Sequence, residues 1–254
     1  MEIGSDKWKR IILSGAGEVN ISVDSTQVDQ FAIHARELLR WNQKINLTAV
    51  TDPLSVAVKH YLDSIAPAKI LPHAGSLLDI GTGGGFPGIP LKILLPSLSV
   101  TLIDASRKKV SFLKHAGRTL GLRDFKVLHI RAEDLRQQII LHPDDRRLAS
   151  ATGSRPTAAY NDRLIEPFNM IVCRALTSLD QFISIALPLL ATDGMMIALK
   201  GRISEPELSS ARRMLHTWLN PQSSTRALYT IRVEKYSLPS VKSRRALVVI
   251  QIDR

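Results

Sequence analysis

The feature of this sequence that most constrains its fold is an apolar run that ends in closely spaced glycines. Leu77–Ile80 has the character of a buried strand, and Gly81, Gly83 and Gly85 follow it before a helical pattern begins near Ile89. Glycine tolerates positive φ and carries no Cβ, so a ligand can lie directly against such a backbone. The segment therefore predicts a strand, a ligand-binding turn and a helix in succession.

After this turn, short apolar runs alternate with helical patterns, which is typical of βαβ units and a parallel sheet. The predicted strands are Leu77–Ile80, Val100–Asp104, Phe125–Ile130, Met170–Arg174 and Met195–Lys200. The predicted helices are Ile89–Leu95, Arg107–Gly121, Leu179–Leu190 and Glu205–Leu219. The last two apolar segments, which predict an antiparallel hairpin, are Ala227–Val233 and Ala246–Ile252. The expected fold class is α/β and Rossmann-like, with a mostly parallel seven-stranded sheet flanked by helices.

The N-terminal part has a different texture. Residues 1–24 mix glycines with basic residues and show no sustained period, so we expect a poorly ordered N-terminal extension. Residues 25–72 contain two helical patterns, of which the first spans Thr26–Trp41. The second is opened by Asp52 as N-cap and Pro53 as first-turn residue. We expect these helices to form a small N-terminal helical cap.

The remaining residues, 73–254, are expected to form the Rossmann-like domain. The length of 254 residues allows one sizeable α/β core with a small appendage. Residues 141–167 interrupt the alternation because they are polar and only weakly periodic. Since this segment is too long for an ordinary connection in such a fold, it is interpreted as a surface insertion.

The composition indicates the partner class. A net charge of +11 gives the surface a positive potential that favours polyanions such as nucleic acid. Cys173 is the single cysteine, so no intrachain disulfide can form and a zinc site built from several thiolates is excluded. No apolar run reaches transmembrane length and the N-terminus lacks an apolar export segment. We expect a cytoplasmic protein with no metal and no membrane partner.

A second residue strengthens the glycine turn as a nucleoside site. Asp104 closes the next strand, at about the spacing expected for a carboxylate that accepts hydrogen bonds from both ribose hydroxyls. The alternative is that the glycines only turn the chain and Asp104 caps the following helix. The combination of glycines and carboxylate favours the nucleoside.

The spacing within the turn distinguishes between nucleoside cofactors. A dinucleotide site normally carries a glycine at the sixth position of its motif, where this chain has Phe86. The pattern Asp79-x-Gly81-x-Gly83-x-Gly85 is instead typical of Rossmann-like methyltransferases that bind S-adenosylmethionine. In those proteins the acidic residue before the glycines helps to hold the amino end of the cofactor.

Further candidates stand at the ends of the later strands. Glu133 follows the third strand, where a carboxylate can meet the exocyclic amine of adenine, although an acidic helix cap explains it equally well. Arg174 ends the fourth strand and can pair with the carboxylate of the cofactor or with RNA phosphate. Lys200 ends the fifth, where substrate contact and a solvated strand end are equally compatible with its position. Cys173 alternates to the opposite face and is interpreted as a core thiol.

Several segments together resemble the RsmG family, also called GidB, of bacterial methyltransferases that modify N7 of a guanosine in 16S ribosomal RNA. The most specific is Gly85–Pro90, which reads Gly-Phe-Pro-Gly-Ile-Pro. The others are Trp41–Thr48, Lys59–Ser64, Asp79–Pro90, Asp104–Lys109, Arg174-Ala175, Leu199–Gly201 and Arg245–Ile250. The resemblance implies a class I methyltransferase fold and S-adenosylmethionine as cofactor.

Carried over position by position, the resemblance also implies site residues. The implied cofactor contacts are Gly81, Phe86, Ala132, Glu133 and Arg174. The chain departs from the family at Lys59, where an arginine before the histidine is usual; lysine keeps the charge and loses the bidentate geometry. This departure affects RNA docking rather than the cofactor.

The basic residues supply the expected contacts to the small ribosomal subunit. The candidates for RNA binding are Lys59, His60, Arg107, Lys108, Lys114, Arg244 and Arg245. Contacts of this kind make binding fall with salt. With few Trp and Tyr residues and no RNA-binding sequence signature, we expect recognition of the shape of a folded RNA, by a monomer.

The resemblance implies a reaction that needs no general base, because N7 of guanine has a free lone pair. Catalysis then rests on aligning N7, the methyl carbon and sulfur. We therefore assign no catalytic acid or base and expect Arg174 and Lys200 to position substrate or cofactor. Two alternatives remain at this point: an NAD(P)-dependent oxidoreductase, and a non-catalytic RNA or ribosome assembly factor with the same fold.

Overall fold

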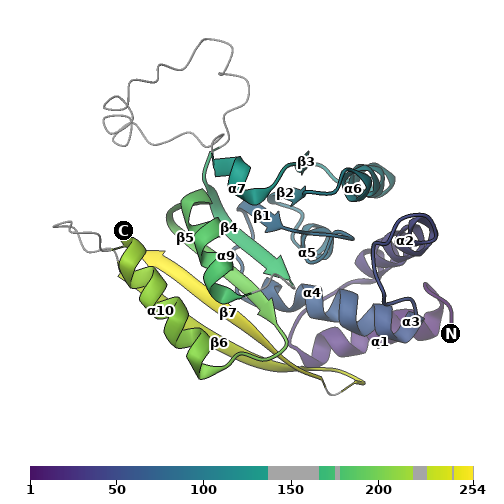
Figure 1. Ribbon diagram of the computed structural model, residues 1–254. Coiled ribbons are helices and arrows are strands. Elements are labelled where there is room, and N and C mark those ends of the chain that lie inside the picture. The colour runs from purple at the N-terminus through teal and green to yellow at the C-terminus, as the bar shows by residue number, and fades with distance from the viewer. Residues whose placement is uncertain (137–165, 175–177, 220–227, 242, 254) are drawn as a thin grey trace, which may run out of the picture.

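A seven-stranded sheet forms the centre of the protein (Figure 1). The computed structural model describes residues 1–136, 166–174, 178–219, 228–241 and 243–253. The strands are β1 (Gly75–Ile80), β2 (Leu98–Asp104), β3 (Phe125–His129), β4 (Phe168–Arg174), β5 (Leu190–Lys200), β6 (Leu228–Leu238) and β7 (Ser243–Asp253). Every predicted strand is therefore present, and the last three are longer than the sequence pattern indicates.

The order of the strands across the sheet is β3-β2-β1-β4-β5-β7-β6. β1 pairs in parallel with both β2 and β4, and the pairs β2–β3 and β4–β5 are parallel as well. β7 lies antiparallel between β5 and β6, so the predicted C-terminal hairpin forms and completes the sheet. The predicted fold class is confirmed. Because the strand order reverses between β1 and β4, ligands are expected at the carboxyl end of β1.

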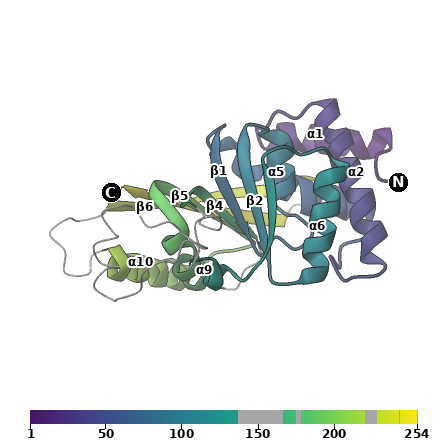
Figure 2. The same ribbon diagram turned by 90° about the horizontal axis from the view of Figure 1, so that it is seen from above.

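Helices cover both faces of this sheet (Figure 2). The first layer contains α1 (Asp6–Glu18), α2 (Ser25–Asn42), α3 (Pro53–Ser55), η1 (Val56–Leu62), α4 (Asp63–Ile65), η2 (Ala66–Lys69), α5 (Gly88–Leu94) and α6 (Arg107–Thr119). The second layer contains α7 (Ala132–Leu135), α9 (Leu179–Ala186), η6 (Leu187–Leu189) and α10 (Glu205–Leu219). The helices predicted within the Rossmann-like part are all found.

Alternation along the strands divides the core in two. Leu77 packs into the core beneath the first helical layer and its neighbour Leu78 into the core beneath the second. Leu247 and Val248 of β7 divide in the same way. Successive side chains of a strand point to opposite faces, so strands covered on both sides are apolar at nearly every position. This is why the central strands appear in the sequence as continuous apolar runs.

The N-terminal segment corrects one expectation. Residues 1–24 are not a poorly ordered extension, because α1 begins at its N-cap Ser5 and packs into the first core. Trp8 is fully buried and its Nε1 donates a hydrogen bond to the carbonyl of Pro53 at 3.0 Å. A Cβ at Gly15 would lie 2.4 Å from Leu62 Cδ1, so glycine there lets α1 approach η1 closely. The apolar residues have helical spacing that the scattered glycines obscure.

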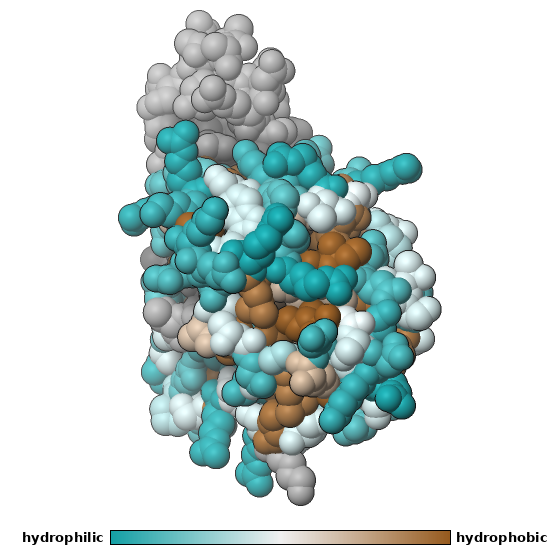
Figure 3. All heavy atoms as spheres, turned by 90° about the vertical axis from the view of Figure 1, so that its right-hand side faces the viewer, coloured by the Kyte–Doolittle hydropathy of each residue, from teal (hydrophilic) through white to brown (hydrophobic). Residues whose placement is uncertain are grey.

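Residues 25–72 fold as predicted but do not form a separate cap. Asp52 accepts a hydrogen bond from the backbone of Ser55 and Pro53 follows it, as expected for this helix start. Phe31 and Tyr61 pack with ring centroids 4.9 Å apart in the core that the sheet also lines. The first helical layer and the sheet are thus parts of one folding unit. Its outer surface is largely hydrophilic around a limited apolar area (Figure 3).

Three further expectations concern the insertion, a membrane span and the single cysteine. The insertion expected at 141–167 lies outside the described residues except for its last two. In the described part of the chain, the helices lack the combination of length and apolar character needed to cross a bilayer. Cys173 is 2% exposed, and burial raises the pKa of its thiol, so the prediction of a core thiol is confirmed.

Candidate active site

The glycine turn follows directly from β1 and leads into α5. Gly81, Gly83 and Gly85 have φ values of 67°, 58° and 89°, in the region that favours glycine. The amide of Gly81 donates to the carbonyl of Ile103 at 3.0 Å, which ties the turn to β2. The predicted strand, turn and helix are therefore confirmed. Among the described residues, nothing lies within 4 Å of a Cβ built on Gly83, so its backbone is open on that side.

Asp79 lies beneath this turn and is fully buried. Its Oδ2 accepts hydrogen bonds from Thr82 Oγ1 at 2.6 Å and from the amide of Gly88 at 2.8 Å. Burial raises the pKa of this carboxyl to about 6, and the two hydrogen bonds oppose that rise. Its Oδ1 is buried and has no partner among the described residues. A buried acceptor without a donor is costly, which marks this oxygen as a place for a ligand donor.

Gly88 is required by the same carboxylate, a role that the sequence analysis did not assign. A Cβ there would lie 2.3 Å from Leu102 Cδ2 and 2.8 Å from Asp79 Oδ2. Any larger residue would separate α5 from β2 and disturb the carboxylate. The signal in the sequence is its place in the Gly-Phe-Pro-Gly-Ile-Pro segment.

Asp104 ends β2 and faces the turn. Its Oδ2 accepts from the amide of Gly83 at 3.1 Å, and its Oδ1 accepts from the amide of Ser106 at 2.8 Å. The N-cap of α6 is Ser106, whose side chain accepts from Lys109, so Asp104 is not the helix cap that the alternative required. The carboxylate is instead held across the gap between β1 and β2.

A cavity of about 230 Å³ opens at this point, and we call it the switch-point crevice. It is lined by Ile80, Gly81, Ile103, Asp104, Ala105, Ile130, Arg131, Ala132, Glu133, Gln181 and Ile185. The structure thus brings together four sequence candidates from β1, β2 and α7. The N-cap of α7 is Arg131, so Glu133 is not the acidic cap that its position also allowed. The sequence analysis did not predict the apolar walls of the crevice. The available signal was the isoleucines at the ends of the predicted strands, Ile80, Ile103 and Ile130.

Other candidates do not line this crevice. Phe86 is 4% exposed and stacks on His60, with ring centroids 4.5 Å apart, on the side of the first helical layer. The guanidinium of Arg174 lies 4.9 Å from the centroid of the Phe86 ring. Since Phe86 is covered on that side, its side chain does not face the crevice.

Arg174 is held by the protein rather than exposed. Its Nη1 donates to the carbonyl of Lys59 at 2.9 Å and to Ser64 Oγ at 3.3 Å, and lies 3.7 Å from Asp63 Oδ2. Burial lowers the pKa of the guanidinium, and the charge of Asp63 opposes that shift. Its side chain keeps 17% exposure. The expected strand-end cation is therefore ordered by η1 and α4, a long-range contact that the sequence does not show.

His34 connects α2 to the turn, and the sequence analysis also missed it. Its Nε2 donates to the carbonyl of Gly84 at 3.0 Å, and Tyr61 donates its hydroxyl to Nδ1 at 2.9 Å. The ring is fully buried, and burial lowers its pKa to about 4, so it is neutral near pH 7. The signal was a polar residue on the apolar face of a predicted helix.

The remaining candidates are Lys200, at the end of β5, and the residues expected to bind RNA. Lys200 Nζ lies 2.9 Å from Glu207 Oε1 of α10, so it is paired rather than simply solvated. The exposed candidates are Lys59, Arg107, Lys108, Lys114 and Arg244. Arg245 is partly buried, with Nε 3.2 Å from Asp63 Oδ1. His60 corrects an expectation: it is 7% exposed and its pKa is lowered to about 3, chiefly by burial, so it offers RNA no charge.

Comparison with known proteins gives a consistent result. Residues 27–145 and 157–230 match the family model of GidB, described as rRNA small subunit methyltransferase G. The ribosomal RNA small subunit methyltransferase G of Geobacter sulfurreducens is 36% identical over 241 residues, which cover 95% of this chain and 96% of that protein. The protein of the same name from Geotalea uraniireducens is 39% identical over 207 residues, which cover 82% and 83%.

Among solved structures, the O-methyltransferase from Bacillus cereus in complex with SAH has a similar fold. The TM-score is 0.55 at 17% identity, with 98% of this chain and 99% of that chain covered. At this identity the similarity concerns the fold. In the described residues there is no group of three or more side chains suited to hold a metal ion.

Proposed function

The chain belongs to the rRNA small subunit methyltransferase G (GidB) family, and from this premise we propose that it methylates N7 of a guanosine in 16S ribosomal RNA. The family is one of S-adenosylmethionine-dependent rRNA methyltransferases, so the oxidoreductase and the non-catalytic factor are set aside. The observation that carries the proposal within the molecule is the switch-point crevice, where the glycine turn and two carboxylates meet.

The residues of the crevice fit this cofactor. When bound, S-adenosylmethionine supplies an electrophilic methyl group on a sulfonium. Asp104 would accept hydrogen bonds from the ribose hydroxyls, since its carboxylate lines the crevice and its Oδ2 lies at the glycine turn. Ala132 and Glu133 would border the adenine, with Ile103 and Ile130 as apolar walls. A nucleoside with a polar edge and an apolar face suits this combination.

The amino acid end of the cofactor would lie toward Asp79. The buried Oδ1 of this carboxylate lacks a donor among the described residues, and an ammonium group would supply one. Gly81, Gly83 and Gly85 would provide backbone without side chains along the same path. Arg174, at the end of β4, would attract the carboxylate of the cofactor, and Phe86 would support its guanidinium from the side of the first helical layer.

No general base is needed for this reaction. The N7 lone pair of guanine attacks without losing a proton first, so the protein contributes by aligning the reacting atoms. Arg174 is ordered by three contacts to η1 and α4, which suits a positioning role. Lys200, at the end of β5 and paired with Glu207, would contact the RNA rather than the cofactor. We further propose that the protein acts in the cytoplasm as a monomer. Light scattering of the purified protein tests the oligomeric state.

Methyl transfer to small ribosomal subunits that lack the modification tests the proposal. Subunits are incubated with the protein and methyl-labelled S-adenosylmethionine, and the labelled nucleoside is identified by mass spectrometry. We expect one 7-methylguanosine in 16S RNA and none with an Asp104→Ala variant. Label on another base or another atom would refute the proposed target, and absence of any label in the native protein would refute the activity.

A further inference from the structure

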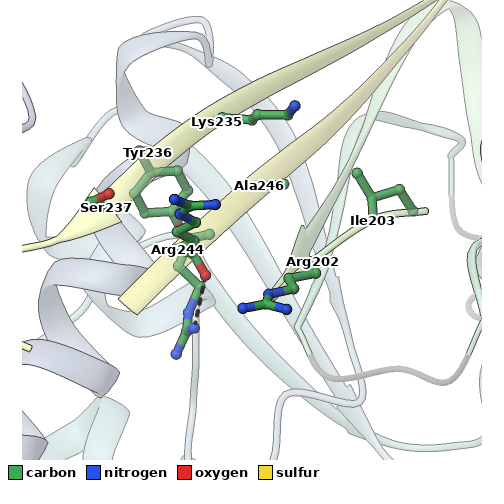
Figure 4. A pocket seen from close by; sticks show the side chains of 9 residues that line it. Arg202, Ile203, Lys235, Tyr236, Ser237, Arg244 and Ala246 are labelled. Atoms are coloured by element: carbon green, nitrogen blue, oxygen red, sulfur yellow. Dashed lines mark hydrogen bonds between the residues drawn. The ribbon is translucent and has the colours of Figure 1, made fainter. Parts of the chain in front are cut away.

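A second cavity opens at the same edge of the sheet, away from the switch-point crevice. It has a volume of about 500 Å³ and lies between the segment after β5 and the ribbon of β6 and β7. Its charged lining consists of Arg202, Lys235, Arg244 and Arg245, and none of the described residues that line it carries a carboxylate. We call it the basic pocket. Figure 4 shows Arg202 extending from beyond β5 toward the ribbon that carries Lys235 and Arg244.

Three of the four cations of this pocket have no ion-pair partner among the described residues. Arg202, Lys235 and Arg244 are exposed, and no ion pair within the described residues involves them. The nearest acid in sequence, Glu234, points to the other face of β6 and pairs with Lys69 at 2.8 Å. Arg245 alone is paired, with Asp63. Cations gathered without counter-charges around a cavity favour a ligand with several negative charges.

The pairing of β6 with β7 fixes the positions of two of the cations, Lys235 and Arg244. Arg244 is paired with Ser237, and Lys235 with Ala246, so the side chains of Lys235 and Arg244 lie on the same face of the ribbon. Ala246 also pairs with Lys200, which connects the ribbon to β5. Lys235 and Arg244 therefore lie on paired strands of the sheet, and Arg202 lies two residues after the end of β5.

A chain of side-chain contacts also joins the pocket to the glycine turn. Asp63 Oδ1 accepts a hydrogen bond from Tyr236 of the pocket wall at 2.9 Å and lies 3.2 Å from Arg245 Nε. Its Oδ2 lies 3.7 Å from Arg174, which in turn covers Phe86. One buried carboxylate thus fixes the position of the pocket relative to the turn.

We propose that the basic pocket binds phosphodiester groups of the RNA chain next to the target nucleotide, an inference that rests on the proposed function. β7 is three strands from β1, which at roughly 4.8 Å per step places the pocket about 14 Å from the turn. A target nucleotide beside the methyl group of the bound cofactor, together with its neighbours along the RNA chain, can span that distance. The phosphates supply repeated negative charges, which match the unpaired cations.

The test compares two triple variants with the same loss of charge. The first is Arg202→Gln/Lys235→Gln/Arg244→Gln. The control is Arg123→Gln/Arg213→Gln/Arg232→Gln, at exposed positions outside the pocket. Affinity for small subunits lacking the modification is measured at several salt concentrations, and affinity for S-adenosylhomocysteine by calorimetry. We expect the pocket variant to reduce the slope of log K against log salt by roughly 2 to 3, the control by much less, and both to bind S-adenosylhomocysteine normally.

The outcomes separate this inference from the proposed function. If the native protein methylates 16S RNA but both triple variants lose the same slope, or neither loses any, the basic pocket has no specific role. If the native protein does not methylate 16S RNA, the proposed function fails first. A photo-reactive benzophenone side chain introduced at Lys235 is expected to label 16S RNA, whereas label on a ribosomal protein alone would overturn the assignment to RNA.

Discussion

The switch-point crevice and the basic pocket lie at the same edge of one sheet and differ in charge. The crevice, above β1 and β2, presents the carboxylates of Asp104 and Glu133 beside apolar walls. The pocket, above β5, β7 and β6, presents cations such as Arg202 and Arg244, with no carboxylate among its described lining residues. A cationic sulfonium nucleoside suits the first and a phosphate chain suits the second. If both proposals hold, one sheet binds two oppositely charged reactants side by side.

The largest effect is expected from removing the carboxylate of the crevice. Asp104→Ala deletes an acceptor for two ribose hydroxyls, and the affinity for S-adenosylhomocysteine should fall about 100-fold, as measured by calorimetry. Asp104→Asn, which keeps one acceptor, should lose about 10-fold. Asp253→Ala, an exposed carboxylate at the far edge, is the control. An unchanged affinity in Asp104→Ala would place the nucleoside elsewhere.

The second largest effect is a difference in how salt changes the affinity of each region for its ligand. If three phosphates contact the basic pocket, raising salt from 50 to 200 mM should weaken RNA binding roughly 20- to 40-fold. S-adenosylhomocysteine, whose contacts lie within the crevice, should lose less than about twofold over the same range. Filter binding measures the affinity for RNA, and calorimetry measures the affinity for S-adenosylhomocysteine. Equal salt dependence of both ligands would remove the contrast between the regions.

A smaller effect is expected at the residue between the two regions. Arg174→Ala removes the guanidinium over Phe86 and its pairing with Asp63, so methyl transfer should fall about 10-fold in kcat/KM while the fold is kept. Arg174→Lys keeps the charge and should recover part of the loss. Arg232→Ala is the control for loss of an arginine. Normal turnover in Arg174→Ala would exclude its positioning role.

The smallest effect concerns the support of the crevice by α2. The folded pKa of His34 is about 4 and the unfolded value about 6.5, so the unfolded state binds more protons between these values. Stability should therefore fall as pH falls, by about 0.5–1 kcal/mol from pH 7 to pH 6 for this group. The difference in urea unfolding between native protein and His34→Gln isolates this contribution. Identical pH dependence in the two proteins would contradict it.

The crevice was largely predictable from the sequence, and the basic pocket was not. Gly81 and Asp104 belong to strand ends that the apolar pattern identifies, so parallel pairing alone brings them together. Arg202, Lys235 and Arg244 are far apart in the sequence and meet only because β7 inserts between β5 and β6. Arg244 was a candidate as one basic residue among several, and nothing local distinguished it.

Burial was the other quantity that local pattern did not supply. His60 was expected at the RNA surface, yet it stacks against Phe86 because η1 packs onto the turn. Trp8 was expected in a poorly ordered N-terminal extension, yet it is fully buried because α1 packs beside η1. In both cases the environment depends on a distant segment.

The sequence by itself determined the α/β fold, the glycine turn and the carboxylate facing it, because strand period and glycine spacing are local properties of the chain. The tertiary structure alone decided which cations remain unpaired and which are held by Asp63. Charge pairing depends on distances between residues that only the packed fold brings together.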